Sequence, residues 1–139
     1  MIFGIGIDIA KCARFEKWLD SPGMLERFFN AKEIPEGAAQ AANGAGGTLS
    51  QAKKSVALQR LAARFAAKEA FSKALGCGLA FDLRDAYIEN QEDGRPVLRL
   101  QNSALEALKK RCPQWEAAKI FVSLSHEKEY AVAQVIIEI

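Results

Sequence analysis

The chain has 139 residues, half of them hydrophobic and 26% charged, a composition typical of globular proteins that excludes intrinsic disorder and collagen-like repeats. A single domain over residues 1–139 is expected at this length. The net charge of +2 is too small for binding nucleic acid through bulk charge, so any anionic partner must meet a local basic patch.

The N-terminal segment and the cysteines predict the cellular compartment. No apolar run approaches the ~18 residues of a membrane span, and the N-terminus lacks the basic stretch of a signal peptide. Cys12, Cys77 and Cys112 have no paired spacing, which indicates reduced thiols and neither a disulfide framework nor a zinc site. We therefore expect a cytoplasmic protein with no membrane partner and no nucleic-acid partner.

The first third of the chain predicts a strand, two short helices and a loop. Ile2 to Ile9 form a β-branched apolar run around two glycines, which predicts a buried strand. Residues 11–19 favour a helix, Pro22 and Gly23 interrupt it, and residues 24–29 resume a short helix. Residues 34–49 contain four glycines and little periodicity, which predicts a flexible loop.

A long helix should follow this loop. Thr48 and Gln51 stand at capping-box spacing, so we expect the helix to begin there and to run to Leu75, with Gly76 in the left-handed conformation. The Asp-Gly turn signal at residues 92–96 predicts a hairpin between strands at residues 85–90 and 97–100.

The last part of the chain predicts one more helix and a second hairpin. Ser103 and Glu106 form a second capping box, for a helix that ends near Arg111 before Pro113. Two apolar strands then flank a polar turn at residues 126–129. The order of elements predicts an α+β fold, with a long central helix packed on a mainly antiparallel sheet.

Charged residues on the long helix are the first chemical signal. The helix is apolar on nearly every side, which is typical of packing against several neighbours. Arg64 and Lys68 fall among its large apolar residues, and Glu69 and Lys73 lie between alanines. Buried charges should meet counter-charges, a metal or a ligand. Two alternatives remain open, a surface ion pair between Glu69 and Lys73 and a Lys68 side chain that extends to water.

Asp8 is the second signal. A carboxylate within an apolar strand needs a partner, and Gly4 and Gly6 leave room for close approach. Asp8 would either cap the next helix or join Glu69 as a ligand of Mg²⁺, which commonly takes one or two protein carboxylates.

Polar residues at the end of a strand are the third signal. Alternation places Ser123 and Ser125 on one side of the strand, and their hydroxyls with the imidazole of His126 suit phosphate oxygens. A turn histidine without function is the alternative.

Four segments together resemble a known family. GIGIDI at 4–9, RFAAKEAFSKALG at 64–76, DGRP at 93–96 and SLSHEKEYAVAQVII at 123–137 resemble, in the same order, the holo-acyl-carrier-protein synthases, the small bacterial 4′-phosphopantetheinyl transferases. The resemblance implies transfer of the phosphopantetheine arm of coenzyme A to a serine of apo acyl carrier protein, with release of adenosine 3′,5′-bisphosphate, in fatty acid biosynthesis. It also implies a homotrimer with each active site between subunits.

The resemblance assigns roles at the reacting phosphates. Asp8 and Glu69 match the ligands of Mg²⁺, and Lys73 matches a lysine beside the pyrophosphate, where its charge would stabilise the leaving phosphate. Glu69 and Lys73 are therefore the catalytic candidates. The proton acceptor stays open between Glu69, through a coordinated water, and His126.

The resemblance also assigns contacts to the rest of coenzyme A. Arg64 and His126 match residues that contact its phosphates, and the hydroxyl of Ser125 suits the same phosphate oxygens. Gly94, Arg95 and Pro96 match a turn beside the adenine.

The carrier protein implies a docking surface. Acyl carrier proteins are acidic, so a basic and partly apolar surface on the early helices is expected, formed by Arg14, Lys17, Met24, Arg27 and Phe28. Scattered surface charge is the alternative for these residues, because acidic residues are interleaved with them. The alternative for the whole chain is a coenzyme A-binding or nucleotide-binding module without catalysis.

Overall fold

The computed structural model describes residues 1–21, 23–38 and 49–139, and the α+β architecture is confirmed. The strands are β1 (Ile2–Lys11), β2 (Ala86–Asn90), β3 (Pro96–Leu100), β4 (Lys119–His126) and β5 (Tyr130–Glu138). The α-helices are α1 (Glu16–Leu19), α2 (Met24–Phe28), α4 (Gln51–Leu75) and α5 (Asn102–Arg111). Short 3-10 helices lie at Cys12–Phe15, Ala31–Glu33, Leu83–Asp85 and Trp115–Ala117.

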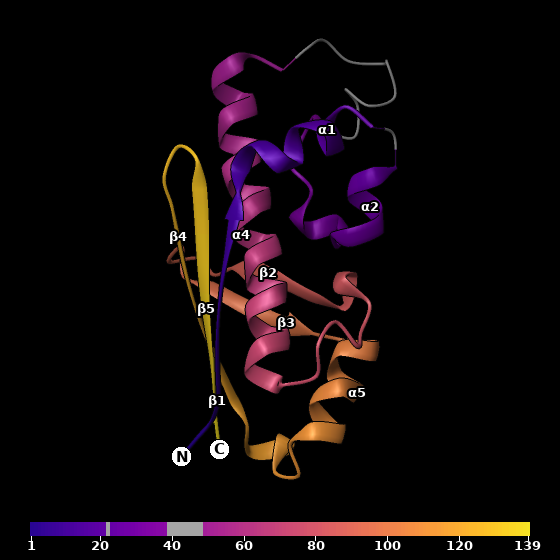
Figure 1. The fold of residues 1–139 in the computed structure, drawn as a ribbon, viewed down its shortest axis with the longest axis vertical. Helices are drawn as coiled ribbons and strands as arrows, with labels where there is room; N and C mark the ends of the chain where they lie inside the picture. The colour runs from indigo at the N-terminus through magenta and orange to yellow at the C-terminus, as the bar shows by residue number, and fades with distance from the viewer. Residues whose placement is uncertain (22, 39–48) are drawn as a thin grey trace.

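The long helix α4 packs against two antiparallel sheets. The order β1-β5-β4 forms the larger sheet, and β2 and β3 form the predicted hairpin. Figure 1 shows α4 running along the larger sheet, with α1 and α2 beside its N-terminal half and α5 near its C-terminal end. No helix in the described part of the chain is long and apolar enough to cross a membrane.

Glycines let β1 lie directly on the helix backbone. A Cβ atom added at Gly4 would lie 1.9 Å from the carbonyl oxygen of Ala74, and one added at Gly6 would lie 1.8 Å from that of Ala70. Only glycine fits these two positions, because the obstructing atoms belong to the backbone of α4. The close approach brings Asp8, on the same face of β1, next to α4.

The prediction that β1 is a buried strand is wrong for its isoleucines. Ile5, Ile7 and Ile9 are 53%, 58% and 64% exposed, because successive side chains alternate and the glycine face is the one that meets α4. Hydrophobicity predicted the strand but not which of its faces would be covered.

The ends of α4 agree with the prediction in part. Gly76 adopts the expected left-handed conformation with φ of +67°. The N-cap, however, is Ser50, whose side chain accepts a hydrogen bond from the backbone N–H of Lys53, so Gln51 is the first helical residue and not the third. Thr48 and most of the predicted loop, residues 39–48, lie outside the described residues, as does Pro22.

The helix α5 is present, but its predicted capping box is wrong. Ser103 lies inside the helix, and the N-cap residue Gln101 makes no side-chain capping bond. The carboxylate of Asp85 takes over this role and accepts bonds from the backbone N–H of Ser103 at 3.1 Å and from its hydroxyl at 2.5 Å. The helix predicted at residues 11–19 is a 3-10 helix followed by α1. It begins at Cys12 and not at Lys11, because Lys11 still pairs in β1.

Candidate active site

Asp8 and Lys73 meet where β1 crosses α4. The Nζ atom of Lys73 donates to Oδ1 of Asp8 at 2.7 Å and to the backbone oxygen of Ile7 at 3.1 Å. Asp8 lies within β1 and caps no helix, so that alternative is wrong. In the described part of the chain Lys73 pairs with Asp8 and not with Glu69, which removes the surface ion pair considered from the sequence.

Glu69 completes this cluster of two carboxylates and an ammonium group. Burial raises the pKa of the half-buried Glu69 side chain, and the charge of Asp8 raises that pKa further, while Lys73 and Arg14 act in the opposite direction. Because the charges of Asp8, Lys73 and Arg14 all change the pKa of Glu69, these groups lie close enough to interact electrostatically with it. We call these three residues, Asp8, Glu69 and Lys73, the acidic cluster.

The donor set of the acidic cluster suits a hard divalent cation. Mg²⁺ commonly binds one or two protein carboxylates and completes its shell with waters and substrate phosphates. A third metal-binding side chain is not grouped with Asp8 and Glu69 among the described residues. Burial and the charge of Asp8 both raise the pKa of Glu69, and a bound divalent cation would favour the ionised form of this carboxylate.

Arg14 joins the acidic cluster to an aromatic surface. Its guanidinium lies 4.8 Å from the ring centre of Phe65 and 5.8 Å from that of Trp18. Trp18 in turn packs on Phe28, with ring centres 4.8 Å apart. Lys17 and Arg27 are exposed and Met24 is half-buried on the same early helices. Trp18 was not among the residues predicted from the sequence, although its helical spacing of four residues from Arg14 was a usable signal.

Lys68 has a partner that sequence reasoning did not find. Its Nζ atom is completely buried and donates to Oε1 of Glu33 at 2.5 Å and to the backbone oxygens of Leu83 and Ala86 at 2.9 and 2.6 Å. The alternative that Lys68 extends to water is therefore wrong. Glu33 lies 35 positions away in the sequence, and no local spacing connects the two residues.

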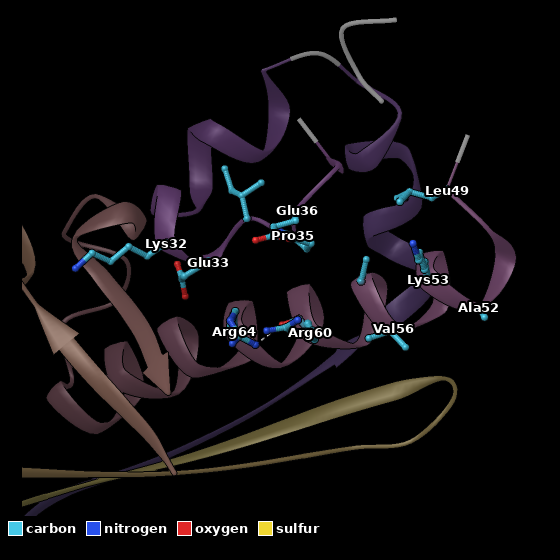
Figure 2. Close-up of a pocket in the computed structure, with 12 residues that line it drawn as sticks. Lys32, Glu33, Pro35, Glu36, Leu49, Ala52, Lys53, Val56, Arg60 and Arg64 are labelled. Carbon is cyan, nitrogen blue, oxygen red and sulfur yellow. Dashed lines mark hydrogen bonds between the residues drawn. The ribbon is translucent and has the colours of Figure 1, made fainter. Parts of the chain in front are cut away.

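Arg64 lies on another side of α4, in a cavity of about 650 Å³ between the helix and residues 32–36. Figure 2 shows Arg64 and Arg60 together on the helix face that lines this cavity, with the β4–β5 hairpin on the opposite side of α4. The guanidinium of Arg64 is thus buried, as predicted, but it does not face the acidic cluster.

The remaining predicted residues are dispersed. Gly94 and Arg95 form the exposed turn between β2 and β3, with φ of +85° at Gly94, and Pro96 begins β3. Ser125 shares a register position with Ile9, on the outer face of the sheet, whereas His126 follows it on the opposite face. In the described residues no hydrogen bond or ion pair links these five residues to the acidic cluster.

Comparison with known proteins places this chain and its fold in a family. The model of the 4′-phosphopantetheinyl transferase superfamily matches residues 4–135. The chain is 48% identical to a holo-[acyl-carrier-protein] synthase of Treponema denticola, with 99% of each chain covered. It is 41% identical to a holo-[acyl-carrier-protein] synthase of Bacillus velezensis, with 99% of this chain and 97% of the relative covered.

Solved structures agree with these relatives. A holo-(acyl-carrier-protein) synthase from Bacillus anthracis in complex with CoA (3′,5′-ADP) is 34% identical, with a TM-score of 0.68 over 99% of this chain and 96% of that one. The Helicobacter pylori holo-[acyl-carrier-protein] synthase in complex with coenzyme A is 27% identical, with a TM-score of 0.67 over 96% and 99% of the two chains.

The chain therefore belongs to the 4′-phosphopantetheinyl transferase superfamily. Within that superfamily its place is among the holo-[acyl-carrier-protein] synthases.

Proposed function

We propose that this chain transfers 4′-phosphopantetheine from coenzyme A to a serine of apo acyl carrier protein and releases adenosine 3′,5′-bisphosphate. Family membership and the full-length relatives support the transferase activity. The site is assigned from one observation: Asp8 accepts a hydrogen bond from Lys73 beside Glu69. Phosphoryl transfer requires positive charge and hard oxygen ligands around the reacting phosphates, and these three residues supply both.

Asp8 and Glu69 would hold Mg²⁺ in this site. When bound there, the ion would neutralise the negative charge of the pyrophosphate and so favour attack on phosphorus. Lys73 already occupies Oδ1 of Asp8, which leaves the other carboxylate oxygen for the metal.

Lys73 and Glu69 perform the chain's own part of the reaction. The serine oxygen of the carrier forms a new bond to the phosphorus nearer the pantetheine, and the bond from that phosphorus to the oxygen of the leaving adenosine bisphosphate breaks. Two donors of the Lys73 ammonium are held by Asp8 and Ile7, so the third is available for the leaving phosphate. Glu69, with its raised pKa, suits the role of acceptor for the serine proton, and His126 is the alternative.

Carrier binding is assigned to the surface that surrounds Arg14. This surface combines the cations Arg14, Lys17 and Arg27 with Phe28 and Met24, which suits an acidic protein with an apolar contact patch. The contribution of Arg14 to the pKa of Glu69 supports its nearness to the reacting groups.

Assembly as a homotrimer would explain the exposed face of the larger sheet and the dispersed residues. Ile5, Ile7, Ile9 and Phe121 are all more than half exposed on that face, and contiguous exposed apolar patches mark interaction sites. Gly94 to Pro96, Ser125 and His126 would then reach the acidic cluster of a neighbouring subunit. Sedimentation should give the mass of three chains. Ile7→Glu should give monomers, whereas Leu79→Glu, at another exposed apolar residue, should not. A monomeric wild type refutes the trimer.

A cytoplasmic location completes the proposal, in agreement with the free thiols of all three cysteines. Residues 1–139 are proposed to act as one domain.

The decisive experiment measures the mass of the carrier. Incubation of apo acyl carrier protein with the chain, coenzyme A and Mg²⁺ should add one phosphopantetheine, and EDTA should prevent it. Glu69→Gln should retain its fold and lose nearly all turnover. Calorimetric binding of coenzyme A without any mass change, and without dependence on Mg²⁺, would instead indicate the non-catalytic module.

A further inference from the structure

Arg14 lies over three aromatic rings that form one cluster. The rings belong to Phe15, Trp18 and Phe65, and the guanidinium carbon of Arg14 lies 5.7, 5.8 and 4.8 Å from their centres. The rings also pack on one another, with centres 4.9 to 5.7 Å apart. Aromatic pairs at such separations attract each other, and a cation over their faces is attracted as well. The place of Arg14 therefore depends on these three rings, which we call the aromatic cluster.

Phe29 packs on the same three rings from the interior of the protein. Its ring centre lies 6.2 Å from those of Phe15 and Trp18 and 6.3 Å from that of Phe65. Only 1% of Phe29 is exposed, whereas Arg14 is an exposed residue. The aromatic cluster thus lies between Phe29 in the core and Arg14 at the surface. A protein that binds at this surface would meet Arg14 but could not reach Phe29.

A buried ion pair fixes Phe29 on α4. The Nζ atom of Lys68 lies 5.5 Å from the ring centre of Phe29. The same ammonium group pairs with Glu33, and both of these side chains are completely buried. Glu33 in turn accepts a hydrogen bond, at 3.2 Å, from the backbone N–H of Asn30, which belongs to the peptide group that follows Phe29. Figure 2 shows Glu33 between its own segment and α4. Phe29 is therefore held at its ring by Lys68 and at its backbone by Glu33.

A fixed Arg14 matters because this residue lies near the reacting groups as well as on the docking surface. Its charge acts on the pKa of Glu69. The neighbouring docking residue Phe28 packs on Trp18, with ring centres 4.8 Å apart, so it depends on the same aromatic cluster. An arginine side chain loses much rotamer freedom when it binds a partner, and a guanidinium that is already held in place loses less.

We propose that Phe29 is a positioning residue for carrier binding, because it supports the aromatic cluster that holds Arg14 beside the acidic cluster. The inference rests on the proposed function, in which Arg14 and Phe28 belong to the carrier-docking surface. Phe29 is buried, and its side chain has no polar group that could take part in the reaction. Its replacement should therefore weaken binding of the carrier and leave coenzyme A binding and the chemical step unchanged.

The first experiment separates the two substrates. Phe29→Leu keeps an apolar side chain but removes the ring, so KM for apo acyl carrier protein should rise about two- to tenfold, as expected for a lost aromatic contact. KM for coenzyme A and kcat should keep their wild-type values. An unchanged KM for the carrier, or an equal rise in both Michaelis constants, overturns the proposal. If Phe29→Leu does not fold, Phe29→Met, whose flexible side chain fills gaps in a core, is measured in its place with the same expectations.

Phe81→Leu is the matched control. Phe81 is a buried phenylalanine outside the aromatic cluster, and its ring centre lies 5.5 Å from that of Phe71. The control loses the same atoms and an aromatic contact, so its melting temperature should fall, as in Phe29→Leu. Its KM for the carrier should nevertheless keep the wild-type value. A similar rise of this KM in both variants would show that any loss of core packing has the effect, and would remove the specific role of Phe29.

A double-mutant cycle tests whether Phe29 acts through Arg14. Arg14→Ala should itself raise KM for the carrier. In that background Phe29→Leu should raise it by a smaller factor than in the wild type, because two residues that act through one contact are not additive. Equal factors in the two backgrounds would overturn the route through Arg14.

A further measurement needs no turnover, so it can fail independently of the transferase activity. In a Trp115→Phe background Trp18 is the only tryptophan, and its fluorescence reports on the aromatic cluster. Phe29→Leu should raise the quenching of Trp18 by acrylamide, because the half-buried indole loses the ring behind it, and Phe81→Leu should not. Unchanged quenching in Phe29→Leu overturns the support of Trp18. Raised quenching in a chain that transfers no phosphopantetheine confirms this support but refutes the proposed function, and with it the role of Phe29 in carrier binding.

Discussion

Replacement of Gly6 by alanine tests the contact on which the acidic cluster depends. The new Cβ would lie 1.8 Å from the backbone oxygen of Ala70, whereas real Cβ contacts are essentially never shorter than 3.0 Å, so β1 must withdraw by at least about 1.2 Å. Ala70 is completely buried, so the helix cannot yield easily. We expect a loss of about 3 kcal/mol in the free energy of unfolding, or a melting temperature about 10 °C lower.

The same displacement should damage catalysis, because Asp8 follows Gly6 by two residues on the same face of β1. A misplacement of about 1 Å at reacting groups can reduce the rate by ~100-fold. Melting is followed by circular dichroism, and transfer is measured by carrier mass at a temperature at which both proteins are folded.

Gly78→Ala is the matched control. Gly78 has a positive φ, +60°, and no atom lies within 4 Å of the added Cβ, so only the backbone strain of about 1 kcal/mol is expected there. If Gly6→Ala melts no lower than Gly78→Ala and transfers at the wild-type rate, β1 does not lie on α4 as described.

Three further predictions concern single groups. Burial and Asp8 raise the pKa of Glu69 above its ordinary value of 4.5, so ionisation of this side chain destabilises the folded state. Glu69→Gln should therefore have a higher melting temperature than the wild type at pH 7 in EDTA. A higher melting temperature that persists at a pH below 4.5 would contradict this cause. Lys68→Met leaves the carboxylate of Glu33 buried without its cation, so the free energy of unfolding, measured in urea, should fall by about 3–5 kcal/mol. The double variant Glu33→Gln/Lys68→Met should recover stability. Equal stability of the single and double variants would count against the ion pair. Asp85→Ala removes the acceptor at the start of α5 and should lose about 1–2 kcal/mol, and no loss would mean that the hydrogen bonds to Ser103 do not stabilise the helix.

Much of the candidate site could be predicted because its residues lie in local patterns. Asp8 stands out as the charged residue of an apolar strand, and Glu69 and Lys73 stand out on a helix that is otherwise apolar. The ion pair between Asp8 and Lys73, by contrast, depends on how β1 crosses α4. No spacing within the helix indicates whether Lys73 will pair with Glu69, four residues away, or with a carboxylate 65 residues away.

The sequence by itself determined the elements whose causes are local. Apolar runs, helical periodicity and turn residues predicted β1, α4 with its left-handed Gly76, and the β2–β3 hairpin, since each depends on residues a few positions apart.

Only the tertiary structure decided the interactions between distant segments. It placed Glu33 on Lys68, gave Asp85 the capping role predicted for Ser103, and turned the isoleucines of β1 away from the helix. The physical reason is the same in each case. Which groups meet depends on how closely two backbones can approach, and at β1 that distance is set by glycines whose partner atoms belong to another element.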